Sequence, residues 1–230
     1  MLIHGLQKLT LLDFPGRVAC TVFLAGCNLR CPFCHNSELI GADAEPVMDD
    51  AALLAFLKKR QGMLDGVAFT GGEPLLRPDL PELLGRVRAL GYAVKLDTNG
   101  TQPAALRRVL GAHLADYVAM DVKNSPARYA ETCGVRSFDI AAVYDCIDQL
   151  RGGDTDYEFR TTVVAELHDE RSFPAIGEMI RGAKRYYLQA FADRDSVMFA
   201  GLHAPDGEKM RAYADLVRPF VASVELRGVG

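Results

Sequence analysis

The residues with the clearest potential for chemistry are three cysteines near the start of the chain. Cys27, Cys31 and Cys34 lie in the segment AGCNLRCPFCHN (25–36), and His35 follows the last of them directly. Thiolates are soft ligands, so this spacing indicates zinc or an iron–sulfur cluster. The run from Cys31 to His35 is also the C-x-x-C-H pattern of covalent haem attachment. Haem attachment belongs to exported proteins, whereas the first residues mix charge, Gly and Pro and do not resemble an export signal.

The zinc and cluster interpretations make different demands on the loop. Three thiolates and one imidazole could complete a tetrahedral zinc site, but joint ligation of one ion by the adjacent Cys34 and His35 is awkward. The sequence also has no second C-x-x-C pair. A cubane cluster held by three cysteines leaves its fourth iron free to bind something other than protein. Gly26 and Pro32 would help a short loop turn tightly around such a cluster.

Composition indicates one compact domain, which we take to be residues 1–230. The 230 residues are 49% hydrophobic and 24% charged, enough apolar content for a sizeable core. Six cysteines without an apparent secretion signal favour metal ligation or chemistry in the cytoplasm over disulfides. The net charge of -4 gives no basis for binding nucleic acid, and no apolar run is long enough to span a membrane.

Strand-like and helix-like segments alternate along the chain. Strands are predicted at 18–25, 66–70, 93–97, 117–121, 157–165, 185–191 and 221–227. Helices are predicted after Asp49 or Asp50 and at 80–90, 101–110, 140–150, 172–181 and 206–217. Such alternation predicts an α/β fold of parallel βαβ units, either an open doubly wound sheet or a barrel. About six units are present where a complete barrel needs eight, so we expect a single-domain partial (β/α)6 TIM-like barrel.

The polar motifs occupy equivalent places in this pattern. GCNLRCPFCHN, TGGEP, DTNG and MDVK each follow the C-terminal end of a predicted strand. Ligands bind at that edge of a parallel sheet. The motifs are therefore expected to form one shared site.

Two of these motifs together resemble the radical S-adenosylmethionine (SAM) superfamily: the C-x3-C-x2-C loop with Phe33 before its last cysteine, and Gly71-Gly72-Glu73-Pro74. Within it, the chain resembles the activating enzymes of glycyl radical proteins, and among them the type that acts on anaerobic ribonucleoside-triphosphate reductase. The matching stretches are LLDFPGRVACTVFLAGCNLRCPFCHN, LDTNG, MDVK, RTTVV, YLQAF and VELRG. Segment 192–205 shows little resemblance. Cys20, Cys133 and Cys146 lack the spacing of a further cluster and are interpreted as buried small hydrophobes.

The resemblance implies a set of site residues. Cys27, Cys31 and Cys34 would be the catalytic residues and ligate three irons of a [4Fe-4S] cluster, while SAM chelates the fourth. The implied cofactor-binding residues are Phe33, Gly71, Gly72, Glu73, Asp97, Thr98, Asn99, Asp121, Lys123, Arg160 and Gln189.

More detailed roles also follow from the resemblance. The glycines would let backbone approach the methionyl end of SAM, and the Glu73 carboxylate would accept from its amino group. Asp121 and Lys123 match a D-x-K element that helps to hold a monovalent cation and the cofactor carboxylate. The planar fork of Arg160 could pair with that carboxylate. His35 is expected to orient the loop or contact the ligand rather than to ligate metal.

The implied function is an oxidoreductase that cleaves SAM reductively and generates a glycyl radical on anaerobic ribonucleotide reductase. Flavodoxin or ferredoxin would supply the electron. A barrel that lacks strands would leave a lateral opening for a loop of the partner. The alternatives are an activase of another glycyl radical enzyme such as pyruvate formate-lyase, a small-molecule radical enzyme, and, in a different class, a non-catalytic zinc-binding module.

Overall fold

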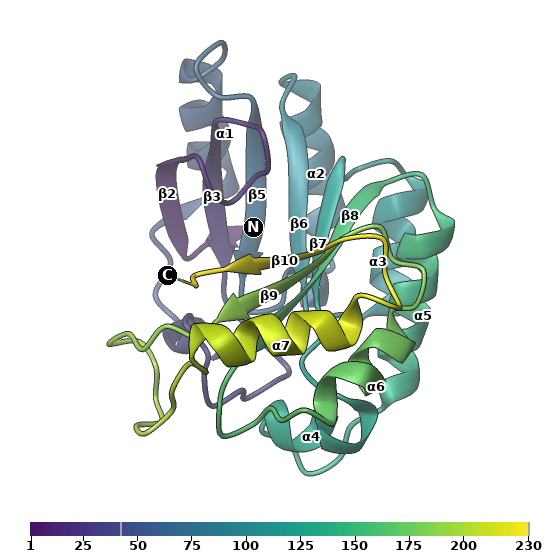
Figure 1. The fold of residues 1–230 in the computed structure, drawn as a ribbon. Helices are drawn as coiled ribbons and strands as arrows, with labels where there is room; N and C mark the ends of the chain where they lie inside the picture. The colour runs from purple at the N-terminus through teal and green to yellow at the C-terminus, as the bar shows by residue number, and fades with distance from the viewer. Residues whose placement is uncertain (42, 230) are drawn as a thin grey trace.

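The computed structural model describes residues 1–41 and 43–229. Its main feature is a curved sheet of eight strands in that part of the chain, in the order β10-β9-β8-β7-β6-β5-β3-β2 (Figure 1). These strands are β2 (Gly5–Thr10), β3 (Ala19–Leu24), β5 (Gly66–Gly71), β6 (Ala93–Thr98), β7 (Tyr117–Asp121), β8 (Asp156–Val163), β9 (Tyr186–Ala190) and β10 (Val224–Arg227). All neighbours from β3 to β10 are parallel, and β2 pairs antiparallel with β3.

One of the longer helices connects each successive pair of parallel strands. The connecting helices are α1 (Asp50–Lys59), α2 (Leu80–Ala89), α3 (Pro103–Gly111), α5 (Ile140–Gly152), α6 (Ser172–Met179) and α7 (Gly207–Val217). Figure 1 shows them outside the curved sheet, whose two edge strands, β2 and β10, do not pair with each other. The predicted partial (β/α)6 barrel is thereby confirmed.

Local sequence explains where the helices begin and end. The carboxylate of Asp49 accepts from Ala52 N and begins α1, Asp139 does the same for α5 through Ala141 N, and Asp206 for α7 through Lys209 N. Gly91 follows α2 with a φ of +90°, a conformation that favours glycine. The chain can therefore leave α2 sharply and enter β6.

Alternate positions on the strands face different surroundings. Cys20, Val22 and Leu24 of β3 are fully buried in the main core, together with apolar side chains of the helices. The opposite face carries a small cluster of Phe14, Ala19, Tyr117 and Ala119 near the strand N-termini. This cluster fills one end of the barrel interior and leaves polar side chains toward the strand C-termini.

Several short elements were not predicted from the sequence. β1 (Leu2–Ile3) pairs antiparallel with β4 (Met48–Asp49). The loops contain η1 (Ser37–Leu39), η2 (Pro74–Leu76), η3 (Pro126–Arg128) and α4 (Tyr129–Thr132). The predicted last strand at 221–227 is shorter than expected and begins at Val224. Among the described residues, no helix is both long and apolar enough to cross a bilayer.

Candidate active site

A cavity lies at the C-terminal ends of the parallel strands. Of the residues nominated from the sequence, those that line it are Cys27, Cys31, Phe33, Cys34, Gly71, Gly72, Asp97, Thr98, Asn99, Asp121, Lys123, Arg160 and Gln189. The other lining residues are Leu29, His35, Asn36, Ile40, Thr70 and Thr162. Of these, only His35 was given a role in the sequence analysis. The motifs therefore share one cavity, as their positions after strands predicted, and Glu73 is the one nominated residue outside its lining.

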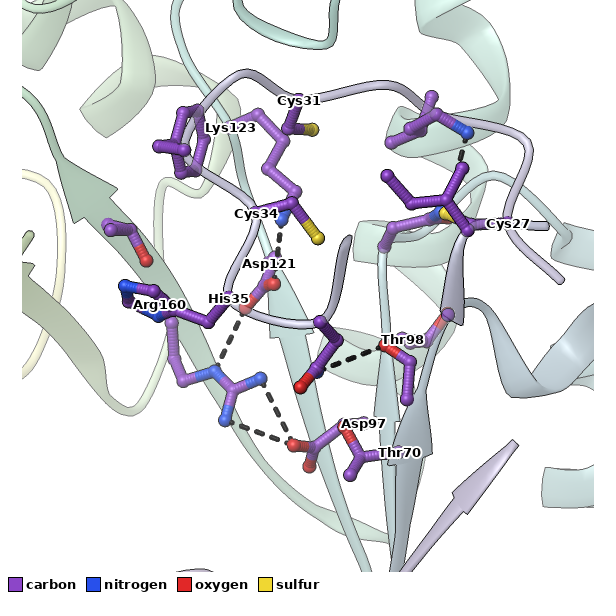
Figure 2. A pocket seen from close by; sticks show the side chains of 18 of the residues that line it. Cys27, Cys31, Cys34, His35, Thr70, Asp97, Thr98, Asp121, Lys123 and Arg160 are labelled. Carbon is purple, nitrogen blue, oxygen red and sulfur yellow. Dashed lines mark hydrogen bonds and ion pairs between the residues drawn. The ribbon is translucent and has the colours of Figure 1, made fainter. Parts of the chain in front are cut away.

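The cluster loop, residues 26–36, carries three thiols on one wall of the cavity. Figure 2 shows the sulfurs of Cys31 and Cys34 turned toward the side on which Cys27 lies. A tight turn brings Cys34 N to 3.1 Å from Cys31 O, and Leu29 N donates to Cys27 Sγ at 3.4 Å. All six cysteines are free, so no disulfide removes a thiol from this wall. Burial raises the pKa of Cys27 and of Cys34.

The two glycines of the GGE motif pack against backbone: Gly72 against the start of the cluster loop and Gly71 against the end of β3. A Cβ on Gly72 would lie 2.3 Å from the Gly26 carbonyl oxygen, and a Cβ on Gly71 would lie 2.4 Å from that of Leu24. The neighbouring amide of Glu73 donates to the Gly26 carbonyl at 2.8 Å. Because backbone meets backbone here, a side chain on Gly72 would push the cluster loop away, and one on Gly71 would push away the end of β3, which leads into that loop. The requirement for glycine thus comes from the loop itself, whatever the ligand does.

An amide network attaches the DTNG loop to the cluster loop. Asn99 Nδ2 donates to Asn28 Oδ1 at 3.0 Å, and Asn28 Nδ2 donates to Thr101 Oγ1 at 2.9 Å. Asn99 Oδ1 in turn accepts from Thr101 N at 3.0 Å. Asn99 therefore holds both loops and also places its amide 3.9 Å from Cys27 Sγ.

Glu73 lies beneath the cavity, with 1% of its surface exposed. Its carboxylate accepts from Leu75 N at 3.0 Å, Thr98 Oγ1 at 2.9 Å and Asn99 N at 2.6 Å. Burial raises the pKa of Glu73 to about 7 although these donors favour the charged form. The carboxylate thus also positions the DTNG loop, while its expected contact with the cofactor amino group stays a prediction.

A network of mostly half-buried charges forms the floor of the cavity. Arg160 Nε lies 2.9 Å from Asp121 Oδ1, and Arg160 Nη2 lies 3.3 Å from Asp97 Oδ2 (Figure 2). Each carboxylate also has a lysine: Lys123 Nζ is 2.8 Å from Asp121 Oδ2, and Lys95 pairs with Asp97. Three cations thus face two carboxylates, which leaves one positive charge in excess.

Mutual attraction keeps Asp121, Lys123 and Arg160 ionised. Burial alone would raise the pKa of Asp121, but Lys123 and Arg160 hold it far below its ordinary value. Burial likewise disfavours the charged forms of Lys123 and Arg160, yet the neighbouring carboxylates raise the pKa of both. Lys123 and Arg160 therefore carry positive charge at neutral pH and suit an anionic ligand group.

The segment without recognised motifs, 192–205, borders the cluster loop. His35 Nε2 lies 2.7 Å from Ala192 O, and the His35 ring stacks on Phe191 with ring centroids 5.7 Å apart. The Ser37 hydroxyl donates to Ser196 O. The expected orienting role of His35 fits these contacts, which connect the end of β9 to the loop that carries the thiols.

A fourth cysteine approaches the cluster loop from the opposite side. Cys133 is fully buried, as expected, and its proximity lowers the pKa of the Cys31 thiol. Its carbonyl accepts from Arg30 N at 2.9 Å. No spacing pattern in the sequence connects Cys133 to the cluster loop, and only the fold reveals this contact.

The donor set fits an iron–sulfur cluster with an additional ligand. Three thiols on one wall supply soft ligands for irons, and the charged floor opposite them suits a carboxylate-bearing molecule. The described residues contain no group of three His, Cys, Asp or Glu side chains placed to hold a single metal ion.

Comparisons with known proteins agree with this geometry. Residues 21–171 match the model of the radical SAM superfamily. A Methanocaldococcus jannaschii protein named as a glycyl-radical enzyme activating enzyme is 28% identical over 99% of this chain and 96% of its own length. The pyruvate formate-lyase-activating enzyme of Clostridium pasteurianum is 32% identical, over 53% of this chain and 52% of its own length.

A solved structure shares the fold. Streptococcus suis SuiB, bound to its precursor peptide SuiA, superposes with a TM-score of 0.70 over 90% of this chain and 48% of its own, at 13% identity. That low identity supports the architecture alone, whereas the family match covers well over half of the chain. The chain belongs to the radical SAM superfamily and is an enzyme whose cofactors are a [4Fe-4S] cluster and S-adenosylmethionine.

Proposed function

We propose that this protein is an activating enzyme that cleaves SAM reductively and generates a glycyl radical on a partner protein. The observation that carries the proposal is the M. jannaschii relative, whose similarity extends over 99% of this chain and therefore includes the segments that surround the cavity. The similarity to the pyruvate formate-lyase-activating enzyme supports the same class over about half of the chain.

In this proposal the chain holds the cluster and SAM side by side. Cys27, Cys31 and Cys34 ligate three irons, and the excess positive charge beside Arg160 receives the methionyl carboxylate. When bound, the reduced cluster supplies the electron that splits the sulfonium into methionine and a 5′-deoxyadenosyl radical. The residues of the chain orient both groups and exclude water from the space between them.

The remaining lining residues have narrower tasks. Thr98 and Asn99 are fixed by Glu73 and line the ligand side of β6, while Gly71 and Gly72 keep the cluster loop close to β5. Phe33 and Gln189 also line the cavity, where they are proposed to contact the cofactor. Both oxygens of Asp121 already pair with cations, so the monovalent cation inferred for the D-x-K element would have to share them.

The partner is proposed to be anaerobic ribonucleotide reductase, with flavodoxin or ferredoxin as donor in the cytoplasm. Pyruvate formate-lyase is an equally consistent partner in view of the C. pasteurianum relative. Because β2 and β10 leave the sheet open, a polypeptide loop could reach the cavity from the side. The family match removes the support for the alternative of a non-catalytic zinc-binding module.

The test is an anaerobic activation assay. The protein is reconstituted with iron and sulfide, reduced, and mixed with SAM and either ribonucleotide reductase or pyruvate formate-lyase from the same organism. A glycyl radical detected by electron paramagnetic resonance (EPR) with one partner identifies it, and Cys31→Ala should abolish both the radical and 5′-deoxyadenosine formation. Cofactor cleavage without a glycyl radical on either partner would refute the activase and point to another radical SAM reaction.

A further inference from the structure

Lys95 places an ammonium group inside the barrel, almost completely away from water. Only 2% of its side chain is exposed, and it lies on β6 two positions before Asp97, on the same face of the strand. Its neighbours at the same level of the sheet are Ala68 on β5 and Tyr117 on β7. Ala119 lies beside Asp97. The two alanines leave space for the long lysine side chain, which extends toward the cavity and pairs with Asp97.

All four carboxylate oxygens of the cavity floor are already paired with cations of the chain. Asp97 Oδ1 pairs with Lys95, and Asp97 Oδ2 lies 3.3 Å from Arg160 Nη2 (Figure 2). Asp121 Oδ1 lies 2.9 Å from Arg160 Nε, and Asp121 Oδ2 lies 2.8 Å from Lys123 Nζ. Hard cations bind through oxygen atoms, and an oxygen that faces an ammonium or a guanidinium would place such an ion beside a like charge. The residues present therefore do not fit the monovalent cation that the D-x-K element implied.

The charge balance of the floor leads to the same conclusion. Three cations of the chain already face two carboxylates. The methionyl part of SAM would bring one carboxylate together with a cationic sulfonium. A monovalent cation would add a further positive charge to this site, and like charges repel strongly where little water screens them. Lys95 brings its charge on a side chain that the strand already holds in place.

We propose that the Lys95 ammonium takes the place of a monovalent cation beside Asp97, so that SAM binding by this enzyme requires neither sodium nor potassium. Lys95 is then a positioning residue, because it holds Asp97, and Asp97 in turn holds the guanidinium of Arg160. The inference rests on the proposed function only in taking the methionyl carboxylate to bind at Arg160, and it is independent of the partner protein. The alternative is that Lys95 only stabilises the fold, in which case its removal would create no requirement for an ion.

Lys95→Met removes the ammonium and keeps a long unbranched side chain. Asp97 retains Arg160 as a partner, so its carboxylate is not left without a cation. Its Oδ1 atom, however, becomes available to a small ion. Lys95→Gln serves the same purpose and keeps the test available if the methionine variant does not fold. The matched control is Arg227→Met, which also removes a cation from an interior carboxylate, that of Glu158, but away from the cavity.

The first measurement is the line width of the sodium NMR signal in the presence of the protein without SAM, with choline as the other cation. Bound sodium broadens this signal. Lys95→Met and Lys95→Gln should broaden it more than wild type does, and potassium should reverse the extra broadening. Arg227→Met should match wild type. Equal broadening by wild type and both Lys95 variants would overturn the inference.

The second measurement is the dissociation constant of SAM from the reconstituted protein in choline, sodium or potassium chloride at equal ionic strength. Wild type and Arg227→Met should give the same value in all three salts. The Lys95 variants should bind SAM roughly tenfold more tightly in sodium or potassium than in choline, because an added ion restores the missing charge. A tenfold dependence in wild type, or none in either Lys95 variant, would contradict the role given to Lys95.

The two measurements separate this inference from the proposed function. Wild-type protein that binds no SAM in any of the three salts would overturn the proposed cofactor site. The sodium signal needs no SAM and would still test whether the Lys95 ammonium excludes an ion from Asp97. Wild-type protein that binds SAM only with sodium or potassium would overturn the inference and leave the proposed function intact.

Discussion

Two groups of charged residues lie at different depths on the inner face of the sheet. β8 contributes one residue to each group, Arg160 to the first and Glu158 to the second. The cavity network comprises Lys95, Asp97, Asp121, Lys123 and Arg160, and all but Lys95 line the cavity. The basal pair comprises Glu158 and Arg227, and the Tyr117 hydroxyl also donates to Glu158. The basal pair lies one step closer to the N-terminal ends of the strands and does not line the cavity.

The two groups differ in charge balance more than in composition. Glu158, 1% exposed, accepts from Arg227 at 2.9 and 3.0 Å and from Tyr117 at 2.8 Å, so one carboxylate faces one cation. In the cavity network three cations face two carboxylates. A balanced pair satisfies itself and stabilises the fold, whereas an excess cation is left to attract a ligand. The difference indicates that the cavity network binds a ligand and that the basal pair stabilises the fold.

The largest effect is expected from Arg160→Met. Each cavity carboxylate keeps its own lysine, so the fold should survive, but the excess charge and its planar fork are lost. Charge-assisted hydrogen bonds to a carboxylate contribute about 1.5–3 kcal/mol, so 5′-deoxyadenosine formation at limiting SAM should fall roughly 10- to 100-fold. Arg160→Lys keeps the charge without the fork and should be intermediate. Wild-type rates in both variants would remove Arg160 from ligand binding.

Arg227→Met should have the opposite effects to Arg160→Met, a loss of stability with no loss of cofactor cleavage. It leaves the buried Glu158 carboxylate without its cation, and breaking such a pair costs about 3 kcal/mol of unfolding free energy, measured by urea denaturation. The rate of cofactor cleavage per folded molecule should stay at the wild-type value. Adding Glu158→Gln removes the stranded charge and should restore part of the stability. A loss of cleavage without a loss of stability would contradict the supporting role of the basal pair.

Sequence alone predicted those parts of the fold that carry their own hydrophobic pattern. The parallel strands from β3 to β9 bury apolar residues, and each connecting helix has one apolar face, so periodicity placed them within a few residues. β2 was not predicted because GLQKLT has no such alternation and three of its residues are exposed. Its existence depends on pairing with β3, a tertiary contact that local propensity does not contain.

The candidate site was predictable to a similar extent and for a related reason. Motifs that follow strands meet at one edge of the sheet, which is why they share one cavity. Thr162 was missed although it lies two positions after Arg160 on β8, and the strand period of two would have placed it on the same face. Cys133 had no such signal, since the contact of its carbonyl with Arg30 N joins segments far apart in the chain.

Glu73 differs from Glu158, because it is a buried carboxylate whose hydrogen-bond partners are neutral, whereas Glu158 pairs with a cation. Its donors are two backbone amides and a hydroxyl, and burial raises its pKa to about 7 from an ordinary value of 4.5. Between pH 4.5 and 7, Glu73 therefore keeps its proton in the folded state but has lost it in the unfolded state. Raising the pH through this window should lower the unfolding free energy of the cluster-free protein, by at most about 1.4 kcal/mol per pH unit, with no further change above the folded-state pKa.

The control for this dependence is Glu73→Gln. The variant cannot titrate at this position, so urea denaturation between pH 5 and 8 should give a flatter profile than wild type. An identical slope in both proteins would show that Glu73 is ionised throughout, and that neutral donors can replace the cation that Glu158 has.

The smallest effect is expected at an ion pair outside both groups. Arg107 Nη2 lies 2.9 Å from Asp145 Oδ1 between α3 and α5, and 62% of the Arg107 side chain is exposed to water. Water and salt screen such a pair, and Gln149 Nε2 still binds Asp145 and the Pro103 carbonyl when the arginine is absent. Arg107→Gln should therefore leave both the denaturation midpoint and the cleavage rate within experimental error of wild type. If it cost as much stability as Arg227→Met, burial would not be what distinguishes the basal pair, and the division of the interior charges into binding and supporting groups would lose its physical basis.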